Sequence, residues 1–394
     1  MASGHGLKPR TVALRLSVVA LVVVMMSGWN RASTSAPATN GPGVTKTTIT
    51  FGQTAPQSGP AALYGESTNG VRAYFSYINS KGGVLHGHKL KLISYDDMYS
   101  PAVSVELTRK LVDQDHVFAE VAVNGSATNK ANLTIQTPAN VPLIGSQTGA
   151  SFLQPFVKNV YNVWPAYTIE GKLLANYGSK KLHLKRIGVL YQNDDFGKSL
   201  LQGVHDANIT TATEQSYEPT QTDFSPQVQA LKSKNADGVI ILAIPGATTA
   251  FLKAMAAVNY KPVRLMSQVA AIPEQFSLSP QMFPGSYLGA FVPPPTDKKN
   301  KQVKTFLAAM NKYEPAKPTS VFAEWGWMEA QVAVAGLKLI TGSITPNSYE
   351  NALNRLKKFH FMGGTISYSS LSHLGLKHMF MEKAAAGKLV QITR

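Results

Sequence analysis

The chain has 394 residues, 44% hydrophobic and 15% charged, which excludes an intrinsically disordered protein and leaves room for two ordinary domains. It contains no cysteine, which excludes disulfide bonds, thiolate metal sites and a lipid-anchored cysteine. The net charge is +16, but the basic residues lie in small groups such as Lys180-Lys181 and Lys357-Lys358. Because no basic stripe alternates with aromatic residues, we favour a solvated basic surface over a nucleic-acid interface.

Residues 1–46 are predicted to lie outside the globular part of the protein. Basic residues precede an apolar run over residues 16–26, and small residues follow it. This order is typical of an export signal, and the run is shorter than the roughly 20 residues that span a bilayer. We expect cleavage between Arg31 and Thr45, in or near a Ser/Thr/Pro-rich flexible tether over residues 34–45. An uncleaved N-terminal anchor is the alternative; in either case the protein is exported, to the periplasm or cell envelope.

Alternating apolar segments and helical periods follow one another over the next hundred residues. Strands are predicted over residues 48–53, 89–95, 117–122 and 141–145. Helices are predicted over residues 70–79, after Pro101 and from Thr128. Strands that alternate with helices indicate a parallel sheet covered by helices on both faces. Ligands of such sheets bind at the carboxyl ends of the strands.

The same alternation returns after an extended connection at residues 160–165. It predicts strands over residues 186–191, 238–243 and 264–268, with helices over 169–177, from 198, from 225 and over 250–258. A stiff Pro293-Pro294-Pro295 segment then leads to helices over residues 303–313 and 322–339. The chain ends with a strand over residues 365–368 and a hairpin of residues 378–383 and 389–392, with its turn at Gly387-Lys388.

Several short segments carry a family resemblance through their order and spacing: residues 52–60, Tyr64-Gly65, 78–84, 89–97, 125–128 and 141–144. They resemble the substrate-binding proteins of ABC importers, in the Leu/Ile/Val-binding branch with the periplasmic binding protein type I fold. The resemblance implies an α/β protein of two doubly wound parallel-sheet lobes joined by a three-segment hinge. The first lobe would comprise residues 47–166 plus 291–363, and the second residues 167–290 plus 364–394.

Catalytic motifs are missing from the sequence. It has no HExxH, GxSxG, GxGxxG or Walker pattern, so an enzyme is disfavoured and neither a metal nor a cofactor is expected. Asp96-Asp97 and Asp194-Asp195 follow predicted strands, where paired carboxylates can bind a metal or transfer protons. We favour a structural role for both pairs, with Asp96-Asp97 capping the helix after Pro101.

Polar loops follow two neighbouring strands and form the predicted binding site. Hydroxyl, amide and backbone donors gather there: Gly125, Ser126, Thr128, Gln147, Thr148 and Gly149. A helix that begins at Thr128 would add free N–H groups, which favour an anionic oxygen. The loops therefore suit a carboxylate or carbonyl group, and ordinary turn residues are the alternative interpretation. The resemblance implies that they hold the α-carboxylate of the ligand.

Three aromatic residues complete the predicted site. The resemblance implies that Tyr64 closes over the ligand side chain and that Phe196 contributes from the second lobe. Trp325 is a candidate for a third apolar wall, although a tryptophan on a helix face is more often part of the core.

One departure from the family concerns the charge of the ligand. The resemblance implies a carboxylate for the ligand ammonium in the loop where this chain has Ser267-Gln268. Gln268 is neutral, and an ammonium buried without a carboxylate costs on the order of several kcal/mol. The ligand is therefore expected to be an amide, an organic acid, an aromatic acid or another small polar molecule rather than Leu, Ile or Val. Asp194 and Asp195 are the alternative source of a carboxylate.

The predicted function combines these observations. We expect an extracytoplasmic protein that captures a small polar solute (an amino acid, amide or organic acid) between two lobes and delivers it to an ABC import permease. Lobe closure would turn on the connections near Pro165, Val292 and Gly363. We expect a monomer that binds neither nucleic acid nor a cofactor. A ligand-sensing module feeding a receptor is the alternative, and an enzyme acting on a small amide is a remote one.

Overall fold

The computed structural model describes residues 40–270, 282–385 and 388–393. The predicted export signal, and Gly387 in the predicted hairpin turn, lie outside these residues. Among the helices of the described residues, none is long and apolar enough to cross a bilayer.

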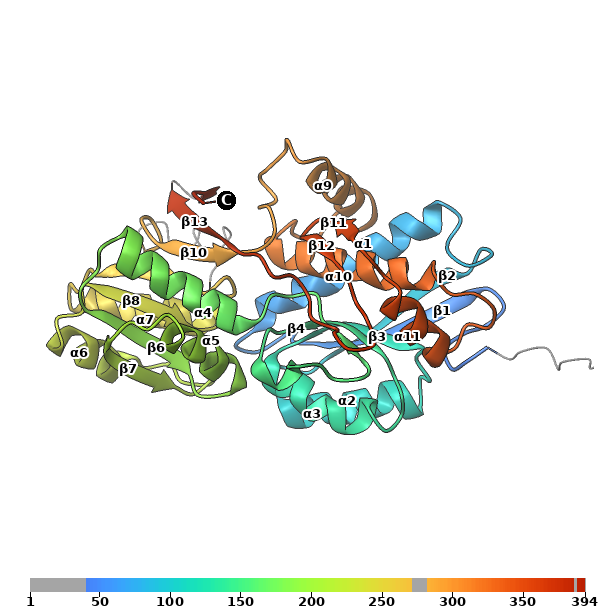
Figure 1. The fold of residues 1–394 in the computed structure, drawn as a ribbon, viewed down its shortest axis with the longest axis horizontal. Coiled ribbons are helices and arrows are strands. Elements are labelled where there is room, and N and C mark those ends of the chain that lie inside the picture. The colour runs from blue at the N-terminus through green and yellow to red at the C-terminus, as the bar shows by residue number, and fades with distance from the viewer. Residues whose placement is uncertain (1–39, 271–281, 386–387, 394) are drawn as a thin grey trace, which may run out of the picture. The chain divides into compact units, whose positions relative to one another are not determined.

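The first lobe is built on a sheet in which every neighbouring pair of strands is parallel, in the order β2-β1-β3-β4-β5 (Figure 1). Its strands are β1 (Thr48–Ala55), β2 (Lys89–Asp96), β3 (Ala119–Asn124), β4 (Leu143–Gln147) and β5 (Val160–Tyr161). Its helical elements are η1 (Ala62–Gly65), α1 (Glu66–Ser80), α2 (Pro101–Asp113), α3 (Ser126–Gln136), η2 (Ser151–Leu153), α9 (Lys301–Tyr313), α10 (Val321–Leu337) and α11 (Pro346–Asn354). β3 and β4 are completely buried, as expected for parallel strands covered on both faces.

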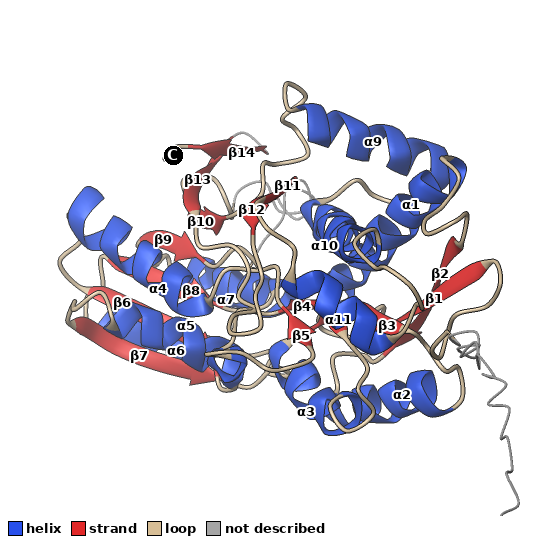
Figure 2. Ribbon diagram, turned by 45° about the vertical axis from the view of Figure 1, so that its right-hand side comes forward, coloured by secondary structure: helices blue, strands red, loops and turns tan. Residues whose placement is uncertain are grey.

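The second lobe is built on a sheet in the order β14-β13-β10-β9-β8-β6-β7 (Figure 2). Its strands are β6 (Ile187–Gln192), β7 (Thr211–Tyr217), β8 (Gly238–Leu242), β9 (Val263–Met266), β10 (Tyr287–Ala290), β13 (Phe380–Ala385) and β14 (Lys388–Gln391). Its helical elements are α4 (Tyr167–Asn176), η3 (Tyr177–Lys181), α5 (Asp195–His205), α6 (Ser225–Ser233) and α7 (Pro245–Ala257). β6 to β10 pair in parallel, whereas β13 and β14 form an antiparallel hairpin at the edge.

Three chain segments connect the two sheets, which confirms the predicted architecture of two parallel-sheet lobes with a three-segment connection. They are residues 162–166, 291–300 and 367–379. The third leaves the first lobe later than the predicted boundary at Gly363, because β12 (Gly364–Ile366) pairs with β11 (Phe359–Phe361). The Leu376 N–H also donates to the Val163 carbonyl at 3.0 Å. The remaining lobe boundaries stay a prediction.

Residues 40–46 differ from the flexible tether that composition predicted. The Gly41 N–H donates to the Ile344 carbonyl at 2.8 Å, and the Thr50 N–H donates to the Gly43 carbonyl at 2.9 Å. The Ile344 N–H in turn donates to Asn40 Oδ1 at 2.9 Å. A composition of small polar residues predicts flexibility, but the backbone of residues 40–46 is hydrogen-bonded to the first lobe.

Several elements begin or lie where the sequence pattern did not place them. β7 was not predicted, because its sequence TATEQSY is polar and lacks an apolar pattern. Such a sequence is compatible with a strand at the edge of the sheet, where β7 pairs only with β6 among the described residues. α5 begins at Asp195 rather than Lys198, since the Asp194 side chain accepts from the N–H groups of Phe196 and Gly197. α11 was also missed, although a capping box at Thr345 and Ser348 marks its start.

Two glycines set the packing of α1 against α10, the helix that carries Trp325. A Cβ atom on Gly70 would lie 1.8 Å from the Ala323 carbonyl oxygen, and one on Gly326 would lie 1.9 Å from the Ser67 carbonyl oxygen. Only glycine permits this backbone approach. The crossing therefore fixes the start of α10, with its aromatic residues, against the first lobe.

Candidate functional site

A small cavity of about 10 Å³ lies between the lobes, and we call it the cleft cavity. The first lobe lines it with Tyr64, Tyr99, Asn124, Gly125, Ser126 and Gln147. Trp164 of the first connection and second-lobe residues Tyr167, Phe196, Ile244 and Val269 complete the lining. Asn124 and Gln147 are the last residues of β3 and β4, and Ile244 follows β8. The cavity therefore lies at the carboxyl ends of strands from both sheets, where parallel sheets bind ligands.

First-lobe side chains around the cavity form a buried hydrogen-bond network. The hydroxyls of Ser126 and Thr148 are 2.7 Å apart, and Asn124 Nδ2 donates to Gln147 Oε1 at 3.0 Å. Gln147 Nε2 donates to Glu329 Oε2 at 2.8 Å, and burial raises the pKa of Glu329 well above its ordinary value. Asn124 Oδ1 is left as a buried acceptor without a hydrogen-bond partner in the described part of the protein. The network thus fixes the amides and leaves an acceptor for a solute donor.

Three predicted donors, Thr128, Thr148 and Gly149, do not line the cleft cavity. The Thr128 hydroxyl donates to the Gly125 carbonyl at 3.0 Å and to the Asn124 carbonyl, so it closes the first turn of α3. The helix begins at Ser126 rather than Thr128. Gly149 lies against the first connection, where a Cβ would be 2.2 Å from the Pro165 carbonyl oxygen. The sequence does not reveal where these donors point, because a donor in a loop can bond the backbone of that loop as well as a ligand.

The predicted aromatic residues Tyr64 and Phe196 do line the cavity. The Tyr64 hydroxyl donates to the Val269 carbonyl at 3.0 Å, which joins the two lobes. The Phe196 ring lies edge-on to Tyr167, with centroids 5.3 Å apart. Tyr99, Trp164 and Tyr167 were missed by sequence reasoning. The only signal that could have found Tyr167 is its place directly after the first connection.

Gln268 and Trp325 lie elsewhere, at a second cavity of about 20 Å³ that we call the back cavity. Both residues are buried. The backbone N–H of Gln268 donates to Glu170 Oε1 at 2.6 Å, and burial raises the pKa of Glu170 to about 7. The Trp325 ring packs against Trp164 at 4.7 Å, so one layer of aromatic rings separates the two cavities.

The two aspartate pairs have structural roles. Asp96 accepts from the backbone N–H groups of Gln57 and Ser58, and burial raises the pKa of Asp97 to about 6. Neither side chain caps α2, which begins without a side-chain cap, so the capping prediction was wrong. The two acids instead fix the loops beside the strand ends.

The second aspartate pair lies where the lobes meet. Asp194 caps α5, while both carboxylate oxygens of Asp195 lie 3.0 Å from Lys130 Nζ on the first lobe. A backbone contact reinforces this pairing, since the Ser151 N–H donates to Ser199 Oγ at 3.0 Å. The lobes are therefore closed on each other around the cleft cavity. Within the described residues, no group of three or more His, Asp and Glu side chains could hold a metal ion.

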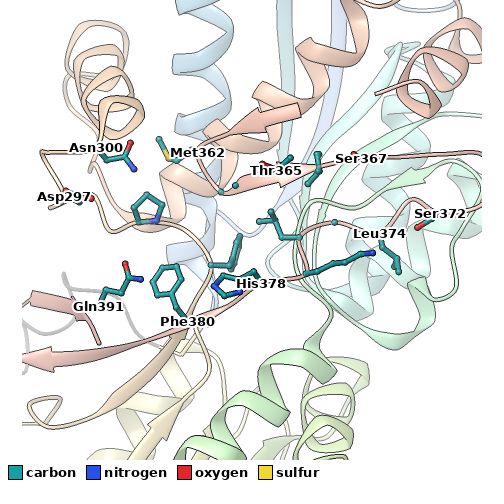
Figure 3. Close-up of a pocket in the computed structure, with 18 residues that line it drawn as sticks. Asp297, Asn300, Met362, Thr365, Ser367, Ser372, Leu374, His378, Phe380 and Gln391 are labelled. Carbon is teal, nitrogen blue, oxygen red and sulfur yellow. The ribbon is translucent and has the colours of Figure 1, made fainter. Parts of the chain in front are cut away.

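A larger cavity of about 680 Å³ lies between the second and third connections (Figure 3). Residues 291–300 and 362–380 supply most of its lining, and His378 and Phe380 project into it from the third connection and β13. None of the predicted site residues lines it. The polar loops that follow β3 and β4 do not line it either, so we place the solute site at the cleft despite its smaller volume.

Comparison with known proteins agrees with this geometry. The family model described as periplasmic binding protein matches residues 48–388. The chain belongs to the periplasmic binding protein family. As such a protein, it also resembles a Leu/Ile/Val-binding protein of Citrobacter freundii, with 27% identity over 46% of this chain and 51% of the relative. The alignment thus spans about half the length of that relative.

Solved structures of other binding proteins share the fold of this periplasmic binding protein. A fatty acid ABC transporter substrate-binding protein from Thermomonospora curvata superposes with a TM-score of 0.81 and 21% identity, covering 90% of this chain and 93% of the other. A branched-chain amino acid transporter substrate-binding protein from Streptococcus pneumoniae, in complex with isoleucine, gives a TM-score of 0.78 and 20% identity, covering 88% and 100%. At these identities, the likeness concerns the fold.

Proposed function

We propose that this protein is an extracytoplasmic solute-binding protein that captures a small polar solute between its lobes and delivers it to an ABC import permease. The observation that carries the proposal is the cleft cavity, which both sheets line at the carboxyl ends of their strands. The names of the relatives, which are binding and transport proteins, support the same class. The solute is bound without chemical change.

Closure of the lobes would couple binding to delivery. Tyr64 and Lys130 of the first lobe bond Val269 and Asp195 of the second, so the two halves meet directly at the cleft. The larger cavity between the second and third connections leaves space for these segments to bend. A solute that contacts both lobes would then stabilise the closed state through its differential affinity for that state.

The solute is proposed to lack an ammonium group. No side chain that lines the cleft cavity is charged, within the described residues, and Gln268 is neutral. A buried ammonium without a carboxylate costs on the order of several kcal/mol. Amides, organic acids and aromatic acids therefore fit better than zwitterionic leucine, isoleucine or valine.

A thermal-shift screen followed by calorimetry tests the function. A solute that binds only the folded protein raises its melting temperature. We expect saturable binding of a compound among amides, organic acids, aromatic acids and amino acids, with a smaller radius of gyration when the solute is bound. Absence of saturable binding across all four classes contradicts the proposed function. Micromolar binding of leucine or valine, abolished by Asp195→Asn, contradicts only the proposed solute class.

A further inference from the structure

The back cavity gathers polar groups from both lobes. The Phe291–Pro295 connection, Val321 and Trp325 of α10, and Leu288, Glu382 and Leu389 of the second sheet surround it together with Gln268. Met266 pairs with Leu288 across β9 and β10, and Leu288 pairs with Glu382 across β10 and β13. Strands β10 and β13 run side by side (Figure 1). Gln268 lies in the turn two residues after the end of β9, and both Gln268 and Glu382 line the back cavity.

These polar groups are buried without partners. Gln268 is 6% exposed and Glu382 is 3% exposed. Four atoms have no hydrogen-bond partner in the described part of the protein: Gln268 Nε2, Gln268 Oε1, Glu382 Oε1 and Trp325 Nε1. Buried polar atoms in native proteins are nearly always hydrogen-bonded, so each such atom calls for an explanation. Four on three residues around one apolar-walled cavity indicate a binding site rather than a packing defect.

The chemistry of the four atoms selects the ligand group. Gln268 Oε1 and Glu382 Oε1 are acceptors, whereas Gln268 Nε2 and Trp325 Nε1 are donors. An ammonium would satisfy the acceptors and leave both donors unpaired, and a carboxylate would do the reverse. A primary carboxamide has two N–H donors and one carbonyl oxygen with two lone pairs, so it matches all four.

We propose that the back cavity is the head-group compartment of the solute site and that the head group is a neutral primary carboxamide. The inference rests on the proposed function, because it names the chemical class of the captured solute. The volume of about 20 Å³ is little more than that of one water molecule, so the lining side chains must move apart to admit the head group. The ring of Trp325, which lines this compartment, packs against the ring of Trp164, which lines the cleft cavity, with centroids 4.7 Å apart.

The sequence alone could not assign Glu382 to the binding site. It lies on the C-terminal hairpin, far along the chain from Gln268, and β10 lies between their strands. Burial raises the pKa of Glu382 to about 7, so near neutral pH it is not held as a full charge. This favours a neutral ligand group beside it over an ammonium.

A matched series of solutes tests the proposal. Calorimetric titration of the purified exported protein with isovaleramide, isovalerate and isopentylamine compares an amide, an acid and an amine on one apolar body. We expect the amide to bind at least tenfold more tightly than either of the others. Gln268→Leu should weaken amide binding at least tenfold and weaken acid binding less, because the amide loses two hydrogen bonds to Gln268 and the acid loses one. Gln268→Glu should reverse the order of amide and amine.

Controls keep the outcome decisive. Gln268→Met serves where the leucine variant fails to fold, and Leu389→Ala alters an apolar wall of the same cavity without changing a donor or acceptor. Equal affinity for the three solutes, or amide binding unaffected by Gln268→Leu, overturns the inference. If another class of solute binds saturably and Gln268→Leu does not change its affinity, the inference fails while the proposed function stands. If no solute of any class binds the wild type, the proposed function itself fails.

Discussion

The two lobes contribute different chemistry to the cleft cavity. The first lobe supplies Asn124, Ser126 and Gln147. Buried hydrogen bonds join Asn124 to Gln147, Gln147 to Glu329, and Ser126 to Thr148. The second lobe supplies Tyr167, Phe196, Ile244 and Val269, and among these side chains only that of Tyr167 carries a polar group. The first lobe is therefore suited to orient a polar group, and the second to cover the apolar part of a solute. The difference arises at the strand ends, where β3 and β4 end in amides and β8 leads into Ile244.

The strongest test of this difference removes the first-lobe hydroxyl pair. Ser126→Ala together with Thr148→Val should weaken solute binding roughly 10- to 100-fold, since a hydrogen bond to a charged group contributes about 1.5–3 kcal/mol. Because the two hydroxyls are partners, their joint removal leaves neither hydroxyl unpaired, and the fold should survive the loss of one further bond, from the Ala150 N–H to Thr148 Oγ1 at 3.1 Å. Calorimetry gives the affinity and circular dichroism the fold. Unchanged affinity would move the solute away from these loops.

The lobes are alike in burying carboxyl groups, and pH measures this common feature. Burial raises the pKa of Glu120 in the first lobe to about 7, so the folded state holds this proton more tightly than the unfolded state. Its contribution to stability is complete below pH ~4.5 and is lost as pH rises through about 7. Glu120→Gln should remove a decline of up to about 1.4 kcal/mol per pH unit in this window.

Urea unfolding at several pH values between 5 and 7.5 measures this effect. The carboxyl group of Glu120 accepts a hydrogen bond from the Gln136 amide, and the amide oxygen introduced by Glu120→Gln can accept the same bond. The variant therefore changes the charge and preserves the packing. Glu106→Gln on the exposed face of α2 is the control and should keep the wild-type pH profile. Parallel profiles for Glu120→Gln and the wild type would show that Glu120 is ionised in the folded protein.

Phe196→Leu tests the apolar second-lobe wall. We expect affinity to fall roughly fivefold, because part of the apolar surface that covers the solute is lost, at about 25 cal/mol per Å². The loss should be similar for solutes with the same apolar body and different head groups. The first-lobe double variant should instead discriminate between head groups. If Phe196→Leu changes the preference between head groups as much as the double variant does, the proposed difference between the two lobes is wrong.

Lys130→Met is expected to have the smallest effect. The pair with Asp195 joins the lobes, but Lys130 is 55% exposed and Asp195 is 37% exposed in their side chains. Exposed ion pairs contribute about 0.2–1 kcal/mol, so affinity should fall less than about fivefold, and less at high salt. Stopped-flow dissociation should show faster solute release. Exposed Lys198→Met on α5 is the control and should not alter release.

Much of the fold followed from sequence. The alternating residues 89–95 and the continuously apolar residues 238–243 both predicted strands, because a half-buried strand alternates and a fully buried parallel strand is apolar throughout. The loops after β3 and β4 were recognised as the polar end of the sheet, since hydroxyl and amide residues followed both strands. Both signals are local, so they can be recognised without knowing which strands and helices pack against each segment.

Only the tertiary structure decided which of these residues face the solute. Thr128 turns its hydroxyl to its own helix although it follows a predicted strand, and Gln268 lines the back cavity although it ends one. Tyr99, Trp164 and Glu382 are far apart in sequence and come to the cavities through long-range packing. Side-chain direction depends on strand register, on the ends of helices and on which lobe lies opposite. A single sequence therefore determined the strands and their polar ends, while the packing of one lobe against the other determined the site.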